Sequence, residues 1–371
     1  MGFIPVNEPL FDGNEKKYLM DCIDTGWISS AGEYVTKLEK GVAEYVGRKG
    51  GVSVCNGTAA LEVAVDALNL PKGSEVILPA FTIISCGNAV IKAGLKPVLV
   101  DADPDTWNMD VNQIEAKITD KTRAIMAVHI YGLPVNMGPV LEIAKKHNLY
   151  VIEDAAEAIG VTCNGKQCGS FGDISAMSFF ANKHITTGEG GMVLADDDKL
   201  IERSGKLKNL FFDAQRRYIH DEIASNFRMT NIQAAIGYAQ LERLNEHMKI
   251  KRSIGEKYNE LLKGNAYLQL PVDKTAYADN MYWIYGMVIK DDVDKDADYA
   301  MDKLKEMGVG TRHFFYPLHL QPAYRKLGLF EGESYPVAEN LAKKGFYIPA
   351  GMGITDEQIK EVAECVKKVF Q

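Results

Sequence analysis

The chain has 371 residues, of which 46% are hydrophobic and 25% charged, which is ordinary composition for a soluble globular protein. The formal net charge is −8, with 50 acidic and 42 basic residues, and no run of Lys and Arg forms a basic stripe. This balance argues against a nucleic-acid partner, although a few arginines could still create a local site for an anionic substrate. The length suggests about two domains.

The cysteines and the amino terminus exclude further classes. None of the six cysteines belongs to a disulfide framework, and Cys163 and Cys168 fit no zinc-binding spacing. We therefore expect reduced, mostly buried thiols and no metal site. The amino terminus lacks the pattern of a signal peptide, and no apolar run reaches the ~18 residues of a membrane span. These features predict a cytoplasmic protein that makes no membrane contact.

Short apolar runs alternate with amphipathic segments along the first two thirds of the chain, which is typical of an α/β fold. Two helices are expected first, over Glu15–Asp24 and Tyr34–Tyr45. A short strand should end at Cys55, followed by a turn and a helix from Thr58 to about Leu68. Further strands, with helices between them (one over Val140–Lys146), are predicted at Glu75–Ala80, Lys96–Asp101, Arg123–Gly132 and Tyr150–Ala156.

Two more strands, DISAMSFF and GGMVLADD, flank the stretch that contains Lys183, so this lysine is expected on a strand-to-strand connection. A long helical stretch should then run from Asn231 to Leu262, before mixed strands and helices. We place a domain boundary near residue 245, which gives a large domain of residues 1–245 and a smaller one of residues 246–371. No Pro/Ser-rich linker separates them, so they should pack closely.

Three predicted strand ends carry groups that could act together, because ligands bind beyond the carboxyl ends of strands in an open α/β sheet. Gly57 and Thr58 open a helix after a strand and could bind an anion, although a Thr-capped helix without a ligand is as common. Asp154 ends an apolar strand, either as a structural acid or as a carboxylate that keeps a ring nitrogen protonated. Lys183 is either a surface amine or a nucleophile held out of water.

Pyridoxal 5'-phosphate requires all three features: a phosphate cradle, an acid opposite the pyridine nitrogen, and a lysine that forms a Schiff base. In this order and on these elements, the three signals reinforce one another. Neither a G-x-G-x-x-G motif after a strand nor a P-loop motif occurs in the chain. A Rossmann or P-loop nucleotide site is therefore not indicated.

The chain resembles the sugar aminotransferases of the DegT/StrS family over essentially its whole length. The blocks that carry the resemblance include CNGTAAL, EVILPAFT, AVHIYGLPVNM, VIEDAAEAIG, GSFGDISAMSFFANKHITTGEGG, NFRMTNIQAAIGYAQLERL and RHFFYPLHLQPAY. The resemblance implies the architecture of fold-type I pyridoxal-phosphate enzymes. This comprises a large domain with a mixed, mostly parallel seven-stranded sheet flanked by helices, and a smaller C-terminal α+β domain. Within the family, the segments WISS, EDAAEAIG and FFANKHITTGEGG look closest to GDP-perosamine synthases.

The resemblance also implies which residues contact the cofactor. Lys183 would form the Schiff base, and Asp154 would pair with the pyridine nitrogen. Glu157 stands where many relatives have Gln near the ring hydroxyl. The phosphate would be bound by Gly57, Thr58 and Ser178. Ile83 replaces the aromatic residue that often stacks on the cofactor ring in relatives.

Other implied contacts concern the substrate and a second subunit. Asn226 would reach the phosphate bound by the partner subunit, which implies a homodimer with shared active sites, while Arg228 would support that loop. The sugar pocket would be lined by Trp27, Ser29 and Ser30. His319 would contact sugar or diphosphate, and His184 is expected to pack beside Lys183. The nucleotide would be met by Arg216, Arg217 and His220, for which a solvated basic turn is the alternative.

The implied reaction moves an amino group from L-glutamate to the C4 ketone of a nucleotide-linked 4-keto-6-deoxyhexose. GDP-4-keto-6-deoxymannose, which would give GDP-perosamine for a surface polysaccharide such as O-antigen, is favoured. The segment RRYIHDEIASNFRMTN, however, lacks the aromatic–Trp pairing of perosamine synthases. The alternatives are another UDP- or dTDP-linked keto sugar or small keto compound, amination at C3, and a non-catalytic regulator. Sugar dehydratases of the family carry His in place of Lys183.

Overall fold

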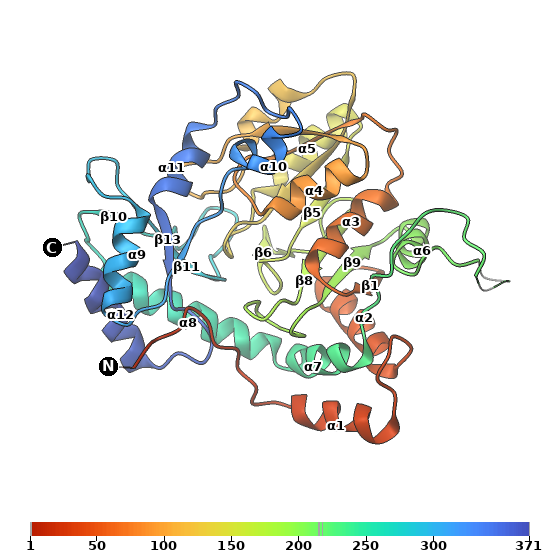
Figure 1. Cartoon of the computed structure of the whole chain (residues 1–371), viewed down its shortest axis with the longest axis horizontal. Coiled ribbons are helices and arrows are strands. Elements are labelled where there is room, and N and C mark those ends of the chain that lie inside the picture. Colours follow the sequence, from red (N-terminus) through yellow and green to blue (C-terminus); the bar gives the residue numbers. More distant parts are fainter. Residues whose placement is uncertain (1, 214–215, 217, 371) are drawn as a thin grey trace.

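The computed structural model describes residues 2–213, 216 and 218–370, and its centre is a seven-stranded sheet in the order β1-β9-β8-β5-β4-β2-β3 (Figure 1). In that order the strands are Gly50–Val54, Gly191–Ala195, Ile174–Ser178, Tyr150–Asp154, Thr122–Val128, Glu75–Pro79 and Lys96–Val100. Only β9 runs antiparallel to its neighbours in this sheet, and the other strand pairs are parallel. The predicted α/β fold with a mixed, mostly parallel sheet is confirmed.

The strands are short apolar runs because both faces of the sheet are covered by helices. On β2, Val76 and Leu78 pack into one hydrophobic cluster and Ile77 into another on the opposite face. The first cluster includes residues of α3 (Gly57–Ala67), α4 (Ile84–Lys92) and α6 (Asp198–Leu207). The second includes residues of α2 (Glu33–Val46), α5 (Met137–His147) and α7 (Asn231–Glu242). Helix α1 (Glu15–Thr25) lies against α7.

The C-terminal part of the chain forms a second, antiparallel sheet in the order β10-β11-β13-β12. These strands are Leu268–Gln269, Tyr285–Ile289, Gly345–Ile348 and Arg312–His313. The helices of this part are α8 (Leu244–Leu262), α9 (Ala297–Glu306), α10 (Pro322–Arg325), α11 (Pro336–Lys344) and α12 (Asp356–Val369). A third hydrophobic cluster is built from residues 254–370 together with Ile4. The domain boundary near residue 245, close to the start of α8, stays a proposal.

Smaller elements complete the fold. Strands Thr162–Cys163 (β6) and Lys166–Gln167 (β7) form a hairpin, and 3₁₀ turns occur at Val111–Gln113, Glu115–Lys117 and Leu318–Leu320. All six cysteines are free, and all except the half-buried Cys55 are buried. No helix in the described part of the chain is long and apolar enough to cross a membrane.

Most element boundaries lie within three residues of the sequence prediction, and two differences are larger. Strand β4 ends at Val128 and does not reach Gly132, because the chain turns there: Tyr131 has φ 58° and Gly132 has φ 98°. The long helix is divided at Arg243, whose backbone (φ −112°, ψ 7°) is not helical. The guanidinium of Arg243 binds Asp12 and Glu246 at this corner.

Candidate functional site

The carboxyl ends of the parallel strands meet at one edge of the central sheet. Strand β5 ends there at Asp154 and β8 at Ser178. Because β9 runs back beside β8, the connection that carries Lys183 crosses the same edge. Backbone bonds close this connection at its base, from Phe179 N to Gly190 O (2.8 Å) and from Thr187 N to Phe179 O (2.9 Å).

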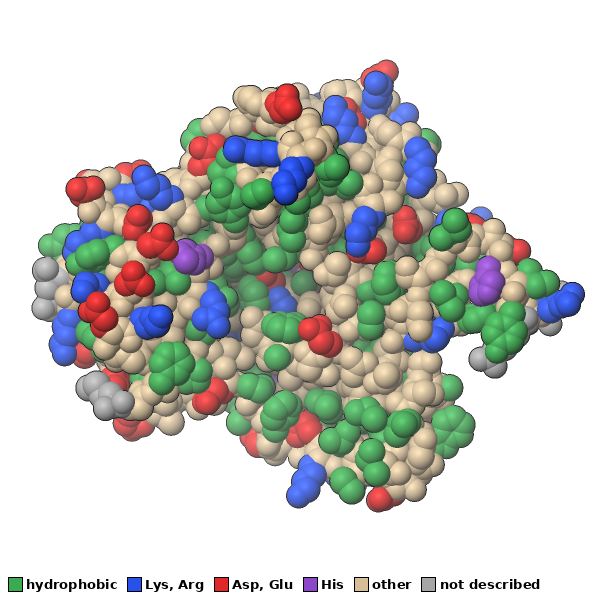
Figure 2. Space-filling model, in the orientation of Figure 1, with side chains coloured by type: hydrophobic (Ala, Val, Ile, Leu, Met, Phe, Trp, Pro, Cys, Tyr) green, Lys and Arg blue, Asp and Glu red, His purple; other side chains and the backbone are tan. Residues whose placement is uncertain are grey.

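A cavity of about 460 Å³ lies at this edge, and Figure 2 shows the hollow between the central sheet and the C-terminal sheet. Every residue that the sequence assigns to the cofactor in the same subunit lines this cavity. They are Gly57, Thr58, Asp154, Glu157, Ser178 and Lys183. Segments far apart in the sequence therefore converge on one cavity, which Ile83 also lines.

The amine of Lys183 is held largely out of water. Its Nζ lies 3.8 Å from Glu157 Oε1, and the side chain is only 10% exposed. Burial lowers the pKa of the Lys183 amine, and the nearby carboxylates of Glu157 and Asp154 oppose this shift. An amine in this setting can lose its proton more readily than a surface lysine, and it can then act as a nucleophile or base.

Asp154 is a buried acid with weak partners. Its Oδ1 accepts a bond from Ala156 N (3.0 Å), and its Oδ2 accepts one from the thiol of Cys86 (3.1 Å). Burial raises the pKa of Asp154, while these two bonds and the charge of Lys183 oppose the shift. A buried carboxylate of this kind favours a cation beside it, and a protonated pyridine nitrogen would supply that charge.

Glu157 is buried on another side of the cavity. Its Oε2 accepts a hydrogen bond from Tyr131 N (2.8 Å). Burial raises the pKa of Glu157 to about 8, although the charge of Lys183 opposes the shift. The raised pKa favours the protonated form of this carboxyl, which could donate its proton to a ring oxygen.

The start of α3 forms a cradle suited to a phosphate. Asn56 caps the helix through a bond from Ala59 N (2.8 Å), and a helix N-terminus favours an anion. A Cβ added to Gly57 would lie 2.7 Å from the Cβ of Ser178, so glycine is needed for this close approach. Thr58 Oγ1 lies 2.8 Å from Ser85 Oγ. Together with the buried amine and acid, this cradle fits pyridoxal phosphate.

Several cavity residues escaped the sequence analysis. Ser85 belongs to α4, while Trp283, Phe315 and Tyr347 come from the C-terminal part of the chain. Cys86, also on α4, reaches the site only through its bond to Asp154. The Lys183 Nζ lies 3.5 Å from the centroid of the Trp283 ring. In the sequence, Trp283 is visible only as an aromatic residue shortly before the apolar strand YGMVI. That pattern does not predict which cavity the ring faces.

The predicted sugar-pocket residues do not line this cavity within one chain. Trp27 and Ser29 lie between α1 and α2, and their carbonyls accept bonds from Asn231 (2.6 and 2.9 Å). Ser30 lines a second hollow of about 540 Å³, together with Arg228. Asn226 pairs with Asn209 through the backbone, and Arg228 Nη1 donates to Asn209 Oδ1 (2.6 Å).

Residues 208–226, which lie between α6 and α7, are here called the arm, and their described part extends away from the body of the molecule (Figure 1). The exposed Arg216 and His220 lie on the arm, and His220 Nδ1 is 2.6 Å from Leu210 O. Arg217, which was predicted to meet the nucleotide, lies outside the described residues. Among the arm residues that the structure describes, none lines the cavity of its own chain.

Two predicted histidines are buried. The Nε2 of His319 lies 3.0 Å from Glu339 Oε1, and the ring packs against Tyr335, so it is not among the residues that line the cavity. His184 Nδ1 lies 3.2 Å from Ile159 O. Burial lowers the pKa of His184 to about 3. The sequence suggested that His184 packs beside Lys183, and its ring is buried here.

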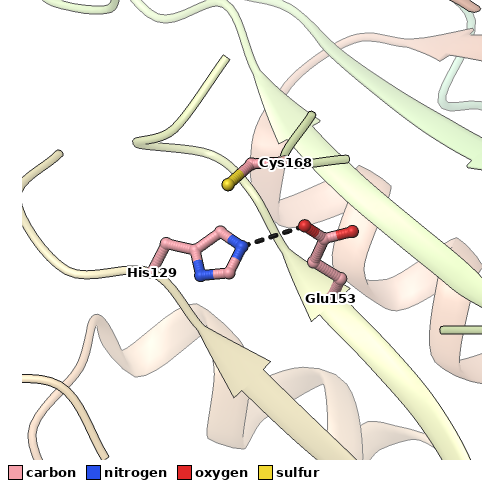
Figure 3. A group of neighbouring side chains, drawn as sticks. All are labelled: His129, Glu153 and Cys168. Atoms are coloured by element: carbon pink, nitrogen blue, oxygen red, sulfur yellow. Dashed lines mark hydrogen bonds and ion pairs between the residues drawn. The ribbon is translucent and has the colours of Figure 1, made fainter. Parts of the chain in front are cut away.

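Figure 3 shows a second group of titratable residues, His129, Glu153 and Cys168, whose possible ligand atoms lie within 4.8 Å of one another. Glu153 accepts bonds from Gly169 N (2.7 Å) and Phe171 N (2.8 Å), and its Oε1 lies 2.9 Å from His129 Nε2. Val135 N donates to His129 Nδ1 (3.1 Å), which places the ring proton on Nε2. Glu153 and His129 thus form a hydrogen-bonded support that ties β5 to the backbone at residues 135, 169 and 171.

Comparison with known proteins adds independent observations. The family model described as the DegT/DnrJ/EryC1/StrS aminotransferase family matches residues 9–367. The GDP-perosamine synthase of Vibrio cholerae is 42% identical over 368 residues, which cover 99% of both chains. That of Escherichia coli O157:H7 is 41% identical and covers 100% of this chain and 99% of its own. A solved aminotransferase from Psychrobacter cryohalolentis superposes with a TM-score of 0.92 at 28% identity, covering 99% and 98% of the two chains.

Proposed function

Since the chain belongs to the DegT/DnrJ/EryC1/StrS aminotransferase family, whose enzymes use pyridoxal phosphate, we propose that it converts GDP-4-keto-6-deoxymannose to GDP-perosamine with L-glutamate as amino donor. The observation that carries the proposal is the convergence of Lys183, Asp154 and Glu157 on one cavity. Relatives named GDP-perosamine synthase are 41–42% identical over nearly the whole chain, which supports the choice of sugar. 2-Oxoglutarate would be the second product.

When bound, pyridoxal phosphate supplies a carbonyl carbon that carries the amino group and a ring that accepts electrons. Lys183 would hold the cofactor and, once released, move a proton to and from the substrate carbon through Nζ. Asp154 would keep a positive charge at the pyridine nitrogen. Glu157 would hold a proton toward the ring oxygen.

We place the phosphate at the N-terminus of α3. Gly57 and Thr58 would bind it with the Ser178 hydroxyl, and the cradle would fix the cofactor against rotation. The walls that exclude water would be the apolar side chains of the same cavity, Ile83, Trp283 and Phe315. Exclusion of water strengthens the electrostatic interactions inside the cavity.

The protein would work as a homodimer in which the arm of one subunit completes the cavity of the other. Several large apolar side chains are exposed on and after α1 and on the arm, and a second subunit would cover them: Met20, Ile23, Trp27, Ile28, Ile219 and Ile223. Figure 2 shows such side chains gathered along the lower edge of the molecule. Asn226 would reach the phosphate across this interface, and Arg216 and His220 the nucleotide, beside Trp27, Ser29 and Ser30.

Absorbance spectroscopy tests the reaction. The visible band of the bound cofactor should bleach with L-glutamate and return on addition of GDP-4-keto-6-deoxymannose, with GDP-perosamine identified by mass spectrometry and NMR. Return of the band only with a UDP- or dTDP-linked keto sugar would replace the acceptor and leave the aminotransferase. Failure to bleach with any amino donor would contradict amino transfer and favour a regulator.

Mixing two inactive variants tests the shared site. Chains carrying Lys183→Ala and chains carrying Asn226→Ala, refolded together, should regain activity, because one of the two cavities in each mixed dimer then contains both native residues. No recovery above the sum of the separate variants would place Asn226 in its own subunit's site or outside the chemistry.

A further inference from the structure

Trp283 lines the cavity, where the proposal above gives it only a place in the wall that excludes water. Its ring centroid lies 3.5 Å from Lys183 Nζ, and its side chain is buried against the lysine. The Glu157 oxygen nearest to the amine is 3.8 Å away, which is beyond a hydrogen bond. The aromatic face is thus in direct contact with the catalytic amine.

Several contacts fix the indole in place. Its Nε1 donates to the carbonyl of Asn182 (2.8 Å), the residue before Lys183, so the ring is tied to the loop that carries the lysine. The carbonyl of Trp283 accepts a bond from the buried Lys251 Nζ (2.9 Å). Across the chain, a Cβ on Gly132 would lie 2.4 Å from Trp283 N. The turn at Gly132 therefore allows the Trp283 backbone to approach the cavity.

We propose that Trp283 is a positioning residue that holds the amine of Lys183 on its ring face whenever this amine is not bonded to the cofactor. The electron-rich face of an indole attracts an ammonium group without presenting a full negative charge. A carboxylate at hydrogen-bond distance would hold the proton on the amine far more tightly. The ring thus orients the amine in the cavity and leaves it able to give up its proton.

The inference rests on the proposed role of Lys183 and requires no particular sugar, so its failure can be told apart from failure of the proposed acceptor. The test uses the cofactor-free protein and the rate at which acetic anhydride acetylates Lys183, followed by mass spectrometry of the peptide across pH. In Trp283→Leu, the pH of half-maximal labelling should fall by about one unit, because the ring no longer stabilises the ammonium form.

Trp283→Phe keeps an aromatic face, so its labelling midpoint should fall less than that of Trp283→Leu. Trp107→Phe replaces a tryptophan outside the cavity lining and is the matched control, and its midpoint should equal that of the wild type. Easier access alone would raise the labelling rate at high pH without moving the midpoint. A midpoint in Trp283→Leu equal to that of the wild type would overturn the inference.

A second measurement keeps Trp283 in place, so it remains possible if Trp283→Leu does not fold. The chain has three tryptophans, so Trp27→Phe with Trp107→Phe makes Trp283 the single emitter. Its fluorescence in the cofactor-free protein should change with pH as the amine titrates, and Lys183→Met should abolish this step. A step that survives Lys183→Met, or no step with Lys183 present, would contradict the contact.

Discussion

Strand β5 presents two neighbouring carboxylates to two very different surroundings. Asp154 faces the cavity, where its bonds come from one backbone N–H and a thiol, a weak donor. Glu153 faces the opposite side, where two backbone N–H groups and the ring of His129 surround it. The hydrogen bonds of a buried acid thus indicate its role. Those of Glu153 all hold the fold together, whereas Asp154 can still accept a bond from a ligand.

The largest expected effect lies on the cavity side, at Lys183. Lys183→Ala should reduce turnover by at least about 10⁴-fold, because the variant loses both the nucleophile and the base. Unfolding temperature should change little, since the side chain donates no hydrogen bond that holds the fold. Turnover by purified protein and thermal unfolding measure the two quantities, and near-native turnover would sink the assignment of Lys183.

Asp154→Asn should come next, with a loss in kcat on the order of 10²–10³-fold. The amide keeps the shape and the bond from Ala156, but it cannot stabilise a positive charge at the pyridine nitrogen. The free energy of unfolding should stay within about 1 kcal/mol of the wild type. An unchanged rate would mean that Asp154 is structural, as Glu153 is.

The isosteric change on the other side, Glu153→Gln, should reverse the pattern. One of the bonds from Gly169 and Phe171 would meet an amide donor, so stability should fall by roughly 3 kcal/mol. Chemical denaturation measures this loss, while kcat of the folded protein should remain within a few-fold. A large loss of kcat with native stability would contradict the contrast between the two acids.

Glu157→Gln should give the smallest and most pH-dependent effect. Burial raises the pKa of Glu157 to about 8 in the folded protein, above its ordinary value of about 4.3 in an unfolded chain. Its contribution to stability is therefore complete below that ordinary value and is lost as pH rises through 8. In cofactor-free protein, the melting temperature of the Gln variant relative to the wild type should rise from pH 5 to about pH 8 and then level off. A difference independent of pH would show that Glu157 does not take up a proton on folding.

Much of the cofactor side of the site could be predicted from the sequence, because each residue stands at the end of a recognisable element. Asp154 follows an apolar strand, Gly57 opens a helix, and Lys183 lies between two strands, so the topology of a parallel sheet brings them to one edge. Trp283 could not be found in this way. Its backbone packs closely against the turn at Gly132, and no local sequence pattern encodes a contact between segments so far apart in the chain.

The roles predicted for the substrate residues depend on a second chain. Trp27 and Asn226 line no part of the cavity in their own subunit, and only the geometry of the dimer would decide what they contact. His319 shows another limit, since a histidine in a motif can be read from sequence whereas its burial against Glu339 cannot. The division of the long helix at Arg243 could not be predicted either, because Arg243 pairs there with Asp12, which lies more than 200 residues earlier in the sequence.

The reversed direction of β9 has a consequence for how this protein and its relatives can change in length. The connection from Phe179 to Gly190 is closed at its base by backbone bonds, so one inserted or deleted residue would move the lysine relative to the acid. The hairpin formed by β6 and β7 carries no group that lines the cavity. Insertions and deletions among relatives should therefore accumulate in that hairpin and be absent between residues 179 and 190, where the length of the connection fixes the position of Lys183.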